Sequence, residues 1–326
     1  MNYVLAPLAD YTNAAFRRLC HQHGADLTYT EMVSAAALAH GSSPTRHLLE
    51  VLPDEGPVAC QLFGHNPDEL AFAAREVTAL KRFVSLDLNA GCPMPRIVQG
   101  GDGAALVRNP QLVHDCLSAI RRETDLPVTL KTRPGPSPDK IVMFELLDAA
   151  ESTGCAGLTL HGRFTSQKHG GEIHYDLIAE IVRRAKIPIT GNGNVYDRPT
   201  ADLMAQTGVS AIMIGRAALK NPWLFGDLKA ESAPPDGDLL VARQNAAFQD
   251  HIANLIELHA QISSRFPDDH VPPLGDYLMG FVRTHLFHYF RGRPNVAVFR
   301  RQLNSIHTLA ELQTATAPFL DSRAGV

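Results

Sequence analysis

A cysteine at position 92 stands in a turn of unusual composition. The apolar run Val84–Asn89 leads into Ala90-Gly91-Cys92-Pro93, and a glycine-rich stretch follows at 100–103. Glycine permits backbone conformations closed to most residues, and proline stiffens a turn. A free thiol has a pKa of about 8.5, so at neutral pH it can donate a proton, or act as a nucleophile if a base activates it. We predict that Cys92 is catalytic; the alternative is a buried structural cysteine.

Two further polar residues end apolar runs. Lys131 lies near the end of Val128–Thr132, and His161 ends Gly157–His161. A lysine at the end of a buried strand is costly unless an anion faces it. A cation and an imidazole together suit a flavin, because positive charge stabilises the reduced ring. The alternatives are a structural ion pair for Lys131 and a hydrogen-bonded core histidine for His161.

Glycines and polar residues follow the last two apolar runs. Asn192-Gly193-Asn194 comes after the first of them and Gly215-Arg216 after the second, and a helical pattern begins beyond each. Backbone N–H groups at such places form the usual phosphate site of a parallel barrel. Each glycine alone could be a simple turn, so their order along the chain is what favours a phosphate site.

The elements that position these residues alternate between strand and helix patterns. Repeated βα units imply a parallel sheet, and eight of them predict a (β/α)₈ TIM barrel, with an open doubly wound sheet as the runner-up. Nearly every strand ends in a polar residue or glycine, and in a barrel these ends meet at one rim. The strands are expected at Tyr3–Ala6, Leu27–Glu31, Val58–Phe63, Val84–Asn89, Val128–Thr132, Gly157–His161, Pro188–Gly191 and Ala211–Gly215.

A second domain is expected beyond the barrel. The segment Glu231–Asp238 has the composition of a linker, so we predict a catalytic barrel over 1–230 and an all-helical domain over 239–326. Its helical patterns are Leu239–Arg265, Leu274–Phe290 and Phe299–Phe319. Arginines gather there, which indicates either a basic face for RNA or an ordinary solvated helix face; they are Arg283, Arg291, Arg293, Arg300 and Arg301.

Composition excludes several classes of protein. The chain has 326 residues, 45% of them hydrophobic, so it is globular rather than disordered. Its 30 Lys+Arg against 34 Asp+Glu give a net charge of −4, which excludes binding to nucleic acid by bulk charge.

The five cysteines are widely spaced without a CxxC, so we expect reduced thiols, no disulfide and no metal site. We find no signal peptide or membrane span, and expect a cytoplasmic protein.

These motifs resemble those of the tRNA-dihydrouridine synthases over roughly residues 3 to 320. The Asn89-to-Pro93 turn with its glycine-rich follower is highly specific to that family, whereas the other motifs are shared loosely with further FMN barrels. The similar segments also include Ala6-Pro7-Leu8, Tyr29-Thr30-Glu31-Met32-Val33, Gln61-Leu62-Phe63-Gly64, Lys131-Thr132-Arg133, His161-Gly162-Arg163, Asn192-Gly193-Asn194 and Gly215-Arg216.

The resemblance implies non-covalent FMN at the barrel mouth, reduced by NADPH, and a D-loop uridine of tRNA as substrate. Hydride would pass from flavin N5 to uracil C6, and Cys92 would protonate C5. The flavin positions of the family fall on Pro7, Leu8, Ala9, Gln61, Lys131, His161, Asn192, Gly193, Asn194, Gly215 and Arg216. The substrate positions are expected at Asn89, which would help to hold the uracil, and at Arg96, Arg283, Arg291 and Arg293.

Two other functions fit parts of the sequence. An FMN barrel oxidoreductase acting on a small molecule, such as dihydroorotate or an enone, would share the flavin residues but would have no use for the helical domain. A catalytically silent RNA-binding protein or tRNA chaperone would need neither Cys92 nor Lys131. For the protein that the family resemblance implies, we expect a monomer.

Overall fold

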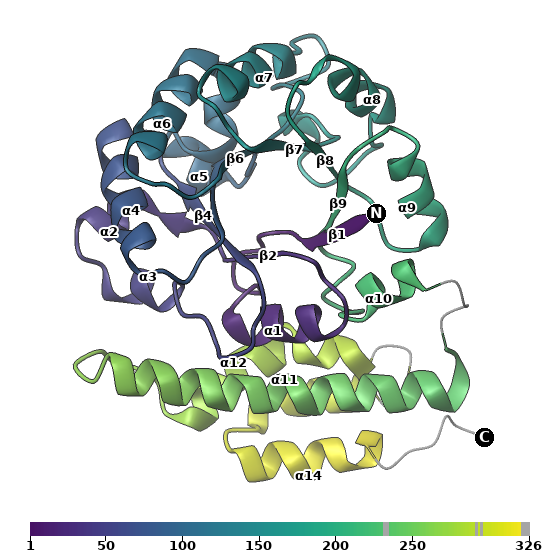
Figure 1. The fold of residues 1–326 in the computed structure, drawn as a ribbon. Helices are drawn as coiled ribbons and strands as arrows, with labels where there is room; N and C mark the ends of the chain where they lie inside the picture. The colour runs from purple at the N-terminus through teal and green to yellow at the C-terminus, as the bar shows by residue number, and fades with distance from the viewer. Residues whose placement is uncertain (231–234, 291–292, 294–295, 321–326) are drawn as a thin grey trace.

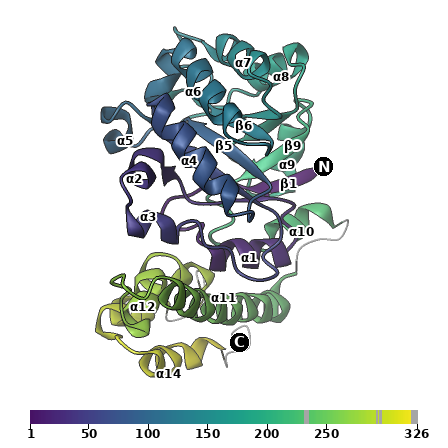
Figure 2. The same cartoon turned by 60° about the vertical axis from the view of Figure 1, so that its left-hand side comes forward.

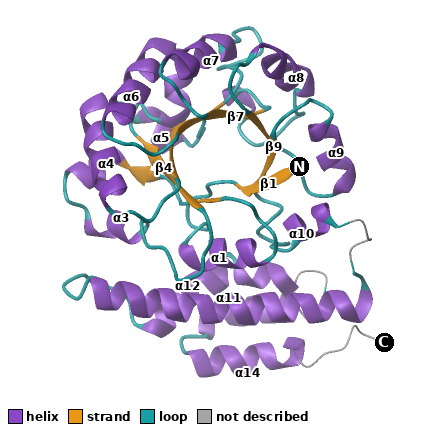
Figure 3. Ribbon diagram, viewed as in Figure 1, coloured by secondary structure: helices purple, strands orange, loops and turns teal. Residues whose placement is uncertain are grey.

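The computed structural model describes residues 1–230, 235–290, 293 and 296–320. Its strands form one parallel sheet that curves into a ring (Figure 3). The order around the ring is β1-β9-β8-β7-β6-β5-β4-β2. These strands are β1 (Asn2–Leu5), β2 (Thr28–Tyr29), β4 (Val58–Phe63), β5 (Ser85–Ala90), β6 (Val128–Thr132), β7 (Gly157–His161), β8 (Ile189–Asn192) and β9 (Ala211–Ile214).

One isolated bridge brings the two ends of the sheet together. Val4 of β1 pairs with Leu27 just before β2, and the Leu5 N–H donates to the Leu27 carbonyl at 2.9 Å. The strand order and this bridge confirm the predicted (β/α)₈ barrel and exclude the open doubly wound sheet. A further two-residue strand, β3 (Val33–Ser34), pairs with β4 and was not predicted, because two residues carry no periodicity.

Helices surround the ring of strands (Figure 1). Several begin at the asparagine or aspartate caps that favour helix starts, such as Asn13, Asn66, Asn109 and Asp197. The helices are α1 (Ala14–Gln22), α2 (Ala35–Ala39), α3 (Ser43–His47), α4 (Pro67–Ala79), α5 (Pro95–Gln99), α6 (Pro110–Arg122), α7 (Met143–Ser152), α8 (Tyr175–Arg184), α9 (Arg198–Ala205) and α10 (Leu224–Lys229).

The strand residues divide between two environments. Alternate residues such as Leu86, Leu130 and Leu158 belong to the main core, where they pack against helices because successive side chains point to opposite faces of a strand. A separate apolar cluster, formed by Val4, Ala6, Tyr29, Ala59 and Met213, fills part of the barrel interior. Polar side chains occupy the remaining interior positions, toward the carboxyl ends of the strands.

The C-terminal region is helical and lies along one side of the barrel, beside α1 (Figures 1 and 2). None of the helices in the described ranges has both the length and the apolar content needed to cross a bilayer. The region contains α11 (Gly237–Arg265), α12 (Leu274–Thr284), α13 (Val296–Gln302) and α14 (Leu309–Leu320), with 3₁₀ turns at Leu286–Phe290 and Leu303–Ser305.

The last two patterns predicted after residue 270 are broken in the structure. The prediction of one helical stretch over Phe299–Phe319 is wrong, because α13 ends at Gln302 and α14 begins at Leu309. Thr308 and Glu311 explain the break: the Glu311 N–H donates to the Thr308 hydroxyl, and the Glu311 carboxylate accepts from the Thr308 N–H at 3.1 Å. This reciprocal cap starts a new helix. Likewise α12 ends at Thr284 and a 3₁₀ turn follows.

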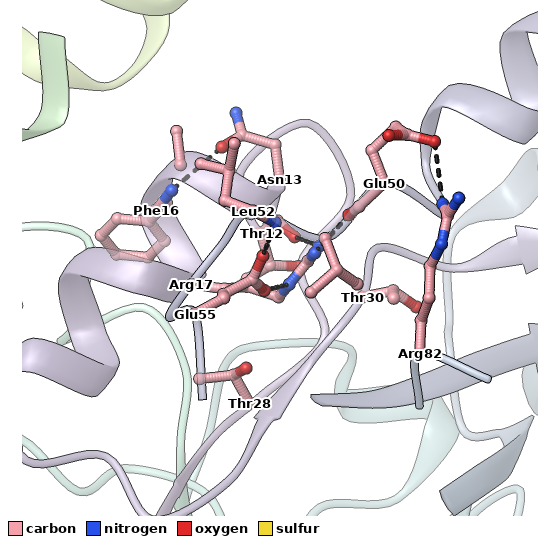
Figure 4. Close-up of polar contacts among 12 residues, drawn as sticks. Thr12, Asn13, Phe16, Arg17, Thr28, Thr30, Glu50, Leu52, Glu55 and Arg82 are labelled. Carbon is pink, nitrogen blue, oxygen red and sulfur yellow. Dashed lines mark hydrogen bonds and ion pairs between the residues drawn. The ribbon is translucent and has the colours of Figure 1, made fainter. Parts of the chain in front are cut away.

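A buried arginine organises the loops on the side of the barrel near α1 (Figure 4). The Arg17 guanidinium donates to Glu55, to the Thr12 carbonyl at 2.8 Å and to the Glu50 carbonyl at 2.7 Å. The Glu50 carboxylate in turn accepts from Arg82. Each nitrogen of this buried guanidinium therefore meets an oxygen atom, which buried charge requires.

The same glutamate and the neighbouring arginine hold α11 against the barrel. Glu50 also accepts from Gln261 and Arg265 of α11, and Arg18 of α1 donates to Asn254 and Glu257. These polar contacts surround the packing of α1 on α11. They fix the orientation of the helical region relative to the barrel.

Two buried histidines, His251 and His285, lie where the helical region packs on the barrel, and they make the folding stability of the protein depend on pH. Burial lowers the pKa of His285 to about 3 and lowers that of His251 well below its usual range. Their rings lie 5.1 Å apart between centroids. The His285 Nε2 faces the Leu219 carbonyl at 3.0 Å, and the His251 Nδ1 faces the Tyr289 hydroxyl at 2.9 Å.

We predict that His285→Gln reduces the acid sensitivity of folding. The unfolded chain binds a proton at His285 below about pH 6.5, whereas the folded protein does not until about pH 3, so protons favour unfolding in that window. As the pH falls from about 6.5, the wild type should lose about 1.4 kcal/mol of unfolding free energy per pH unit more than the variant. Urea unfolding at several pH values measures this difference. The exposed His270→Gln should keep the wild-type slope; equal slopes for wild type and His285→Gln would contradict the assignment.

Candidate active site

The sheet register brings the polar strand ends together on one rim. Asn89 of β5 pairs with Lys131 of β6, and His161 of β7 pairs with Asn192 of β8. These pairs lie at the carboxyl ends of the strands, where parallel barrels build their sites. Residues far apart in the sequence thus meet on one rim.

The Cys92 turn is held by hydrogen bonds to its own strand. The Gly91 and Cys92 N–H groups both donate to Asn89 Oδ1 at 3.0 Å, and the Ala104 N–H donates to the Cys92 carbonyl at 2.9 Å. Gly103, with φ +57°, packs so closely that a Cβ there would lie 2.9 Å from the Cys92 oxygen. Only glycine fits at 103, so the glycine-rich follower supports the turn.

The environment of Cys92 keeps its thiol protonated. Burial raises the pKa of Cys92, although the Met94 N–H and the charges of Arg133 and Lys131 oppose that shift. Cys92 is half-buried, whereas the remaining cysteines are free and buried: Cys20, Cys60, Cys116 and Cys155. Cys92 is therefore the cysteine whose thiol lies at the rim and can donate a proton near neutral pH.

Lys131 reaches an amide rather than a carboxylate. Its Nζ donates to Asn192 Oδ1 at 3.0 Å, and Asn192 Nδ2 donates to the Met213 carbonyl at 2.8 Å. Burial lowers the pKa of Lys131 to about 8; the charge of Arg133 adds to this shift and that of Asp87 opposes it. Among the described residues no carboxylate lies within 4.0 Å of Nζ, so the ammonium keeps hydrogens for an anionic group of a ligand.

His161 is a neutral hydrogen-bond donor. Burial lowers its pKa well below the usual range, and the charges of Arg133 and Lys131 add to that effect. The Arg163 N–H donates to His161 Nδ1 at 3.3 Å, which places the ring proton on Nε2. The imidazole thus carries one ring N–H, on Nε2, without adding charge.

The ends of β8 and β9 form a cationic corner. Gly193 has φ +130°, and a Cβ there would lie 2.4 Å from Ile173 Cδ1, so glycine is required. Asn194 follows with φ +58°, and Arg216 is exposed after Gly215. Successive backbone N–H groups in such conformations can surround an anion.

Arg163 belongs to this corner, and the sequence reasoning missed it as a site residue. Its side chain is buried; Nε donates to the Gly171 carbonyl at 2.9 Å, while Nη1 has no hydrogen-bond partner among the described residues. Burial lowers the pKa of Arg163, and the nearby charge of Arg216 lowers it further. A buried guanidinium N–H beside a second cation fits a phosphate. The His161-Gly162-Arg163 motif was the signal that could have identified it.

The loop after β1 completes the rim. The Leu8 N–H donates to the Thr12 hydroxyl at 3.0 Å, which holds Pro7, Leu8 and Ala9 in a tight turn. A Cβ on Gly215 would lie 3.7 Å from Leu8 Cδ2. Leu8 therefore borders the corner from the side of β1.

The amide groups of Gln61 and Asn89 are engaged by the protein. Gln61 Nε2 donates to Asp87 and Gln61 Oε1 accepts from Asn89 Nδ2 at 2.8 Å. The second hydrogen on Asn89 Nδ2 faces Met32 Sδ at 3.0 Å. Thioether sulfur is a weak acceptor, so that hydrogen can be given up to a carbonyl oxygen of a ligand.

The arginines expected to contact substrate have different surroundings. Arg96 is exposed on α5. Arg283 donates to the Leu303 and Ile306 carbonyls, and Arg293 donates to Gln244, Val241 and Phe319, so both guanidinium groups hold helix ends together. Arg291 lies outside the described residues. Exposed arginines of α13 are Arg300 and Arg301.

Fold and site together define a parallel α/β-barrel enzyme. Its rim carries the protonated thiol of Cys92, the Lys131 ammonium, which has no acidic partner in the described ranges, and the cationic corner at the ends of β8 and β9. The family model for dihydrouridine synthase (Dus) matches residues 4–323, and the chain belongs to this family. The sequence is 33% identical to a probable tRNA-dihydrouridine synthase of Mycobacterium tuberculosis, over 99% of this chain and 84% of that protein. It is 32% identical to tRNA-dihydrouridine synthase B of Yersinia pestis, over 98% and 96%.

These comparisons confirm the family resemblance drawn from the sequence, and with it an oxidoreductase of this family. Membership implies a flavin cofactor. The cationic corner, in which Arg163 Nη1 has no hydrogen-bond partner among the described residues, fits the phosphate of such a group.

We predict that alkylation of Cys92 by iodoacetamide has its midpoint above about pH 8.5, the value of an ordinary thiol, because burial raises the pKa of Cys92. Mass spectrometry of the Cys92 peptide across a pH series measures the profile. Lys131→Met should move the midpoint further upward, since the ammonium opposes the shift. A midpoint below that of a small thiol would contradict this electrostatic account.

Proposed function

We propose that this protein reduces a uridine in the D-loop of tRNA to 5,6-dihydrouridine, with FMN as the flavin and NADPH as the reductant. The observation that carries the proposal is the protonated, half-buried thiol of Cys92 on the same rim as the Lys131 ammonium and the His161 N–H. Saturating a C–C double bond of a pyrimidine needs both a hydride and a proton, and this rim offers the proton.

The residues of the rim fit FMN in two places. Arg163, Arg216 and the backbone at Gly193 would hold its phosphate, which is the group that accounts for the Arg163 Nη1 left without a partner in the described residues. Lys131 and His161 would face the ring, where a cation and an N–H stabilise negative charge. When bound, FMN supplies the hydride that uracil C6 receives.

Cys92 would deliver its proton to uracil C5. The charges of Arg133 and Lys131, which already act on the thiol, stabilise the thiolate left behind. Asn89 keeps the turn in place through the Gly91 and Cys92 N–H groups, and its hydrogen facing Met32 can be offered to a uracil carbonyl. Cys92 thus acts as a general acid rather than as a nucleophile.

The substrate must be taken out of the stack to reach this rim. Extruding a base costs a few kcal/mol and is easiest in a loop. We propose that the barrel, residues 1–230, carries the catalytic site and that the helical domain, residues 239–326, completes the tRNA-binding face. Exposed Arg96, Arg300 and Arg301 supply local positive charge on a chain whose net charge is −4.

We predict that Cys92→Ala lowers dihydrouridine formation about 10²- to 10⁴-fold, the usual contribution of a general acid. Flavin content and NADPH oxidation should stay near wild-type values, since neither needs the proton of Cys92. Mass spectrometry of nucleosides from tRNA that lacks dihydrouridine, after incubation with protein and NADPH, measures the product.

Cys155→Ala is the matched control, because Cys155 is a buried cysteine outside the rim. Dihydrouridine formed by Cys92→Ala at the wild-type rate would refute the role of the thiol. Wild-type protein that reduces an enone or oxidises dihydroorotate while leaving tRNA unchanged would instead favour a small-molecule oxidoreductase.

A further inference from the structure

A continuous chain of hydrogen bonds runs from a buried carboxylate to the Cys92 turn. Asp87 Oδ2 accepts from Gln61 Nε2 at 2.7 Å, Gln61 Oε1 accepts from Asn89 Nδ2 at 2.8 Å, and Asn89 Oδ1 accepts from the Gly91 and Cys92 N–H groups. Asp87 and Gln61 are fully buried, and Asn89 is nearly so. Among the described residues this chain links the thiol turn to the interior of the barrel.

Only one direction of this chain satisfies every group. The two backbone N–H groups are fixed donors, so Asn89 must present its oxygen to them and its NH₂ to Gln61. Gln61 must then present its oxygen to Asn89 and its NH₂ to the next residue. That residue has to offer an acceptor, and the Asp87 carboxylate does so. Its other oxygen accepts from the Thr129 hydroxyl.

We propose that Asp87 is a positioning residue for the general acid, setting the amide orientations of Gln61 and Asn89 and thereby the geometry of the Cys92 turn. The inference rests on the proposed function, because it concerns the thiol that donates the proton. Asp87 does not reach the rim itself; it acts through two amides. Burying a carboxylate is costly, and the chain explains what that carboxylate does at position 87.

Asp87→Leu removes the acceptor at the buried end of the chain with little change of size. The Gln61 NH₂ then has no partner at position 87, so nothing at that end fixes the orientation of the Gln61 and Asn89 amides. When the Asn89 amide turns, its oxygen no longer accepts from the Gly91 and Cys92 N–H groups, and the turn loses both hydrogen bonds.

Asp87→Asn is the matched control, because it keeps an acceptor at position 87. The new amide oxygen accepts from Gln61 Nε2, and the new NH₂ donates to the Thr129 hydroxyl, which can donate in turn to the Leu86 carbonyl. The Gln61 and Asn89 amides therefore keep their orientations. Thr129→Val is a second control, because it removes the other hydrogen bond to Asp87 and leaves the chain itself intact.

Two measurements are made on each FMN-loaded variant. The first is the pH profile of Cys92 alkylation, which does not need tRNA. The second is the single-turnover rate of dihydrouridine formation at saturating tRNA. Asp87→Leu should shift the alkylation profile and slow turnover roughly 10- to 100-fold, as expected for a misplaced catalytic group. Asp87→Asn and Thr129→Val should both keep the wild-type alkylation profile.

Wild-type alkylation and turnover in Asp87→Leu would overturn the proposal. So would an Asp87→Asn variant that folds but shows the same altered alkylation profile as Asp87→Leu, because the acceptor at position 87 would then not be what matters. If Asp87→Leu does not fold, Gln61→Leu interrupts the chain at its middle, and an unchanged Cys92 alkylation profile in that variant would also overturn the proposal. Alkylation of Cys92 does not require tRNA. A failure of the proposed function, in which wild-type protein makes no dihydrouridine, can therefore be told apart from a failure of the proposal for Asp87.

Discussion

Polar side chains inside the barrel are buried away from bulk water, so they must satisfy one another. Asp87, Gln61 and Asn89 form one such set, and Lys131 with Asn192 forms another. Each member of these sets has its orientation fixed by its neighbour, because a reversed amide would leave a buried donor or acceptor unpaired at a cost of about 1–3 kcal/mol. The position of the Cys92 turn follows from this constraint, as does the direction in which Lys131 points.

The electrostatics of the rim follow from the same burial. Burial raises the pKa of the Cys92 thiol and lowers those of Lys131 and His161. Lys131, Arg133, Arg163 and Arg216 collect positive charge around the opening, while no carboxylate within the described part of the chain pairs with Lys131. This arrangement of charge favours the binding of anions. The Cys92 thiol stays neutral in the resting protein, and the nearby cations stabilise the thiolate once the proton has been transferred.

The helical region is attached to the barrel by both apolar and polar contacts. Glu50, Arg18 and Asn254 join α11 to the barrel side, and the buried pair His251 and His285 adds a dependence on pH. A helical region fixed in this way presents one surface in a constant relation to the barrel mouth. That arrangement suits a substrate much larger than a nucleoside.

The sequence by itself predicted the barrel and the polar residues near most of its strand ends, because alternation of βα units and polar strand ends are local patterns. It also identified Cys92, Lys131, His161 and the glycines at 193 and 215 as candidates. Tertiary structure alone decided that the side chains of Gln61 and Asn89 hydrogen-bond to each other. It also decided that Arg163 Nη1 has no hydrogen-bond partner in the described residues. The guanidinium groups of Arg283 and Arg293 bind carbonyl groups at helix ends for the same reason. The physical reason is that the hydrogen-bond partners of a side chain come from distant strands and loops. The spacing of residues within one segment does not determine which of these partners the side chain will contact.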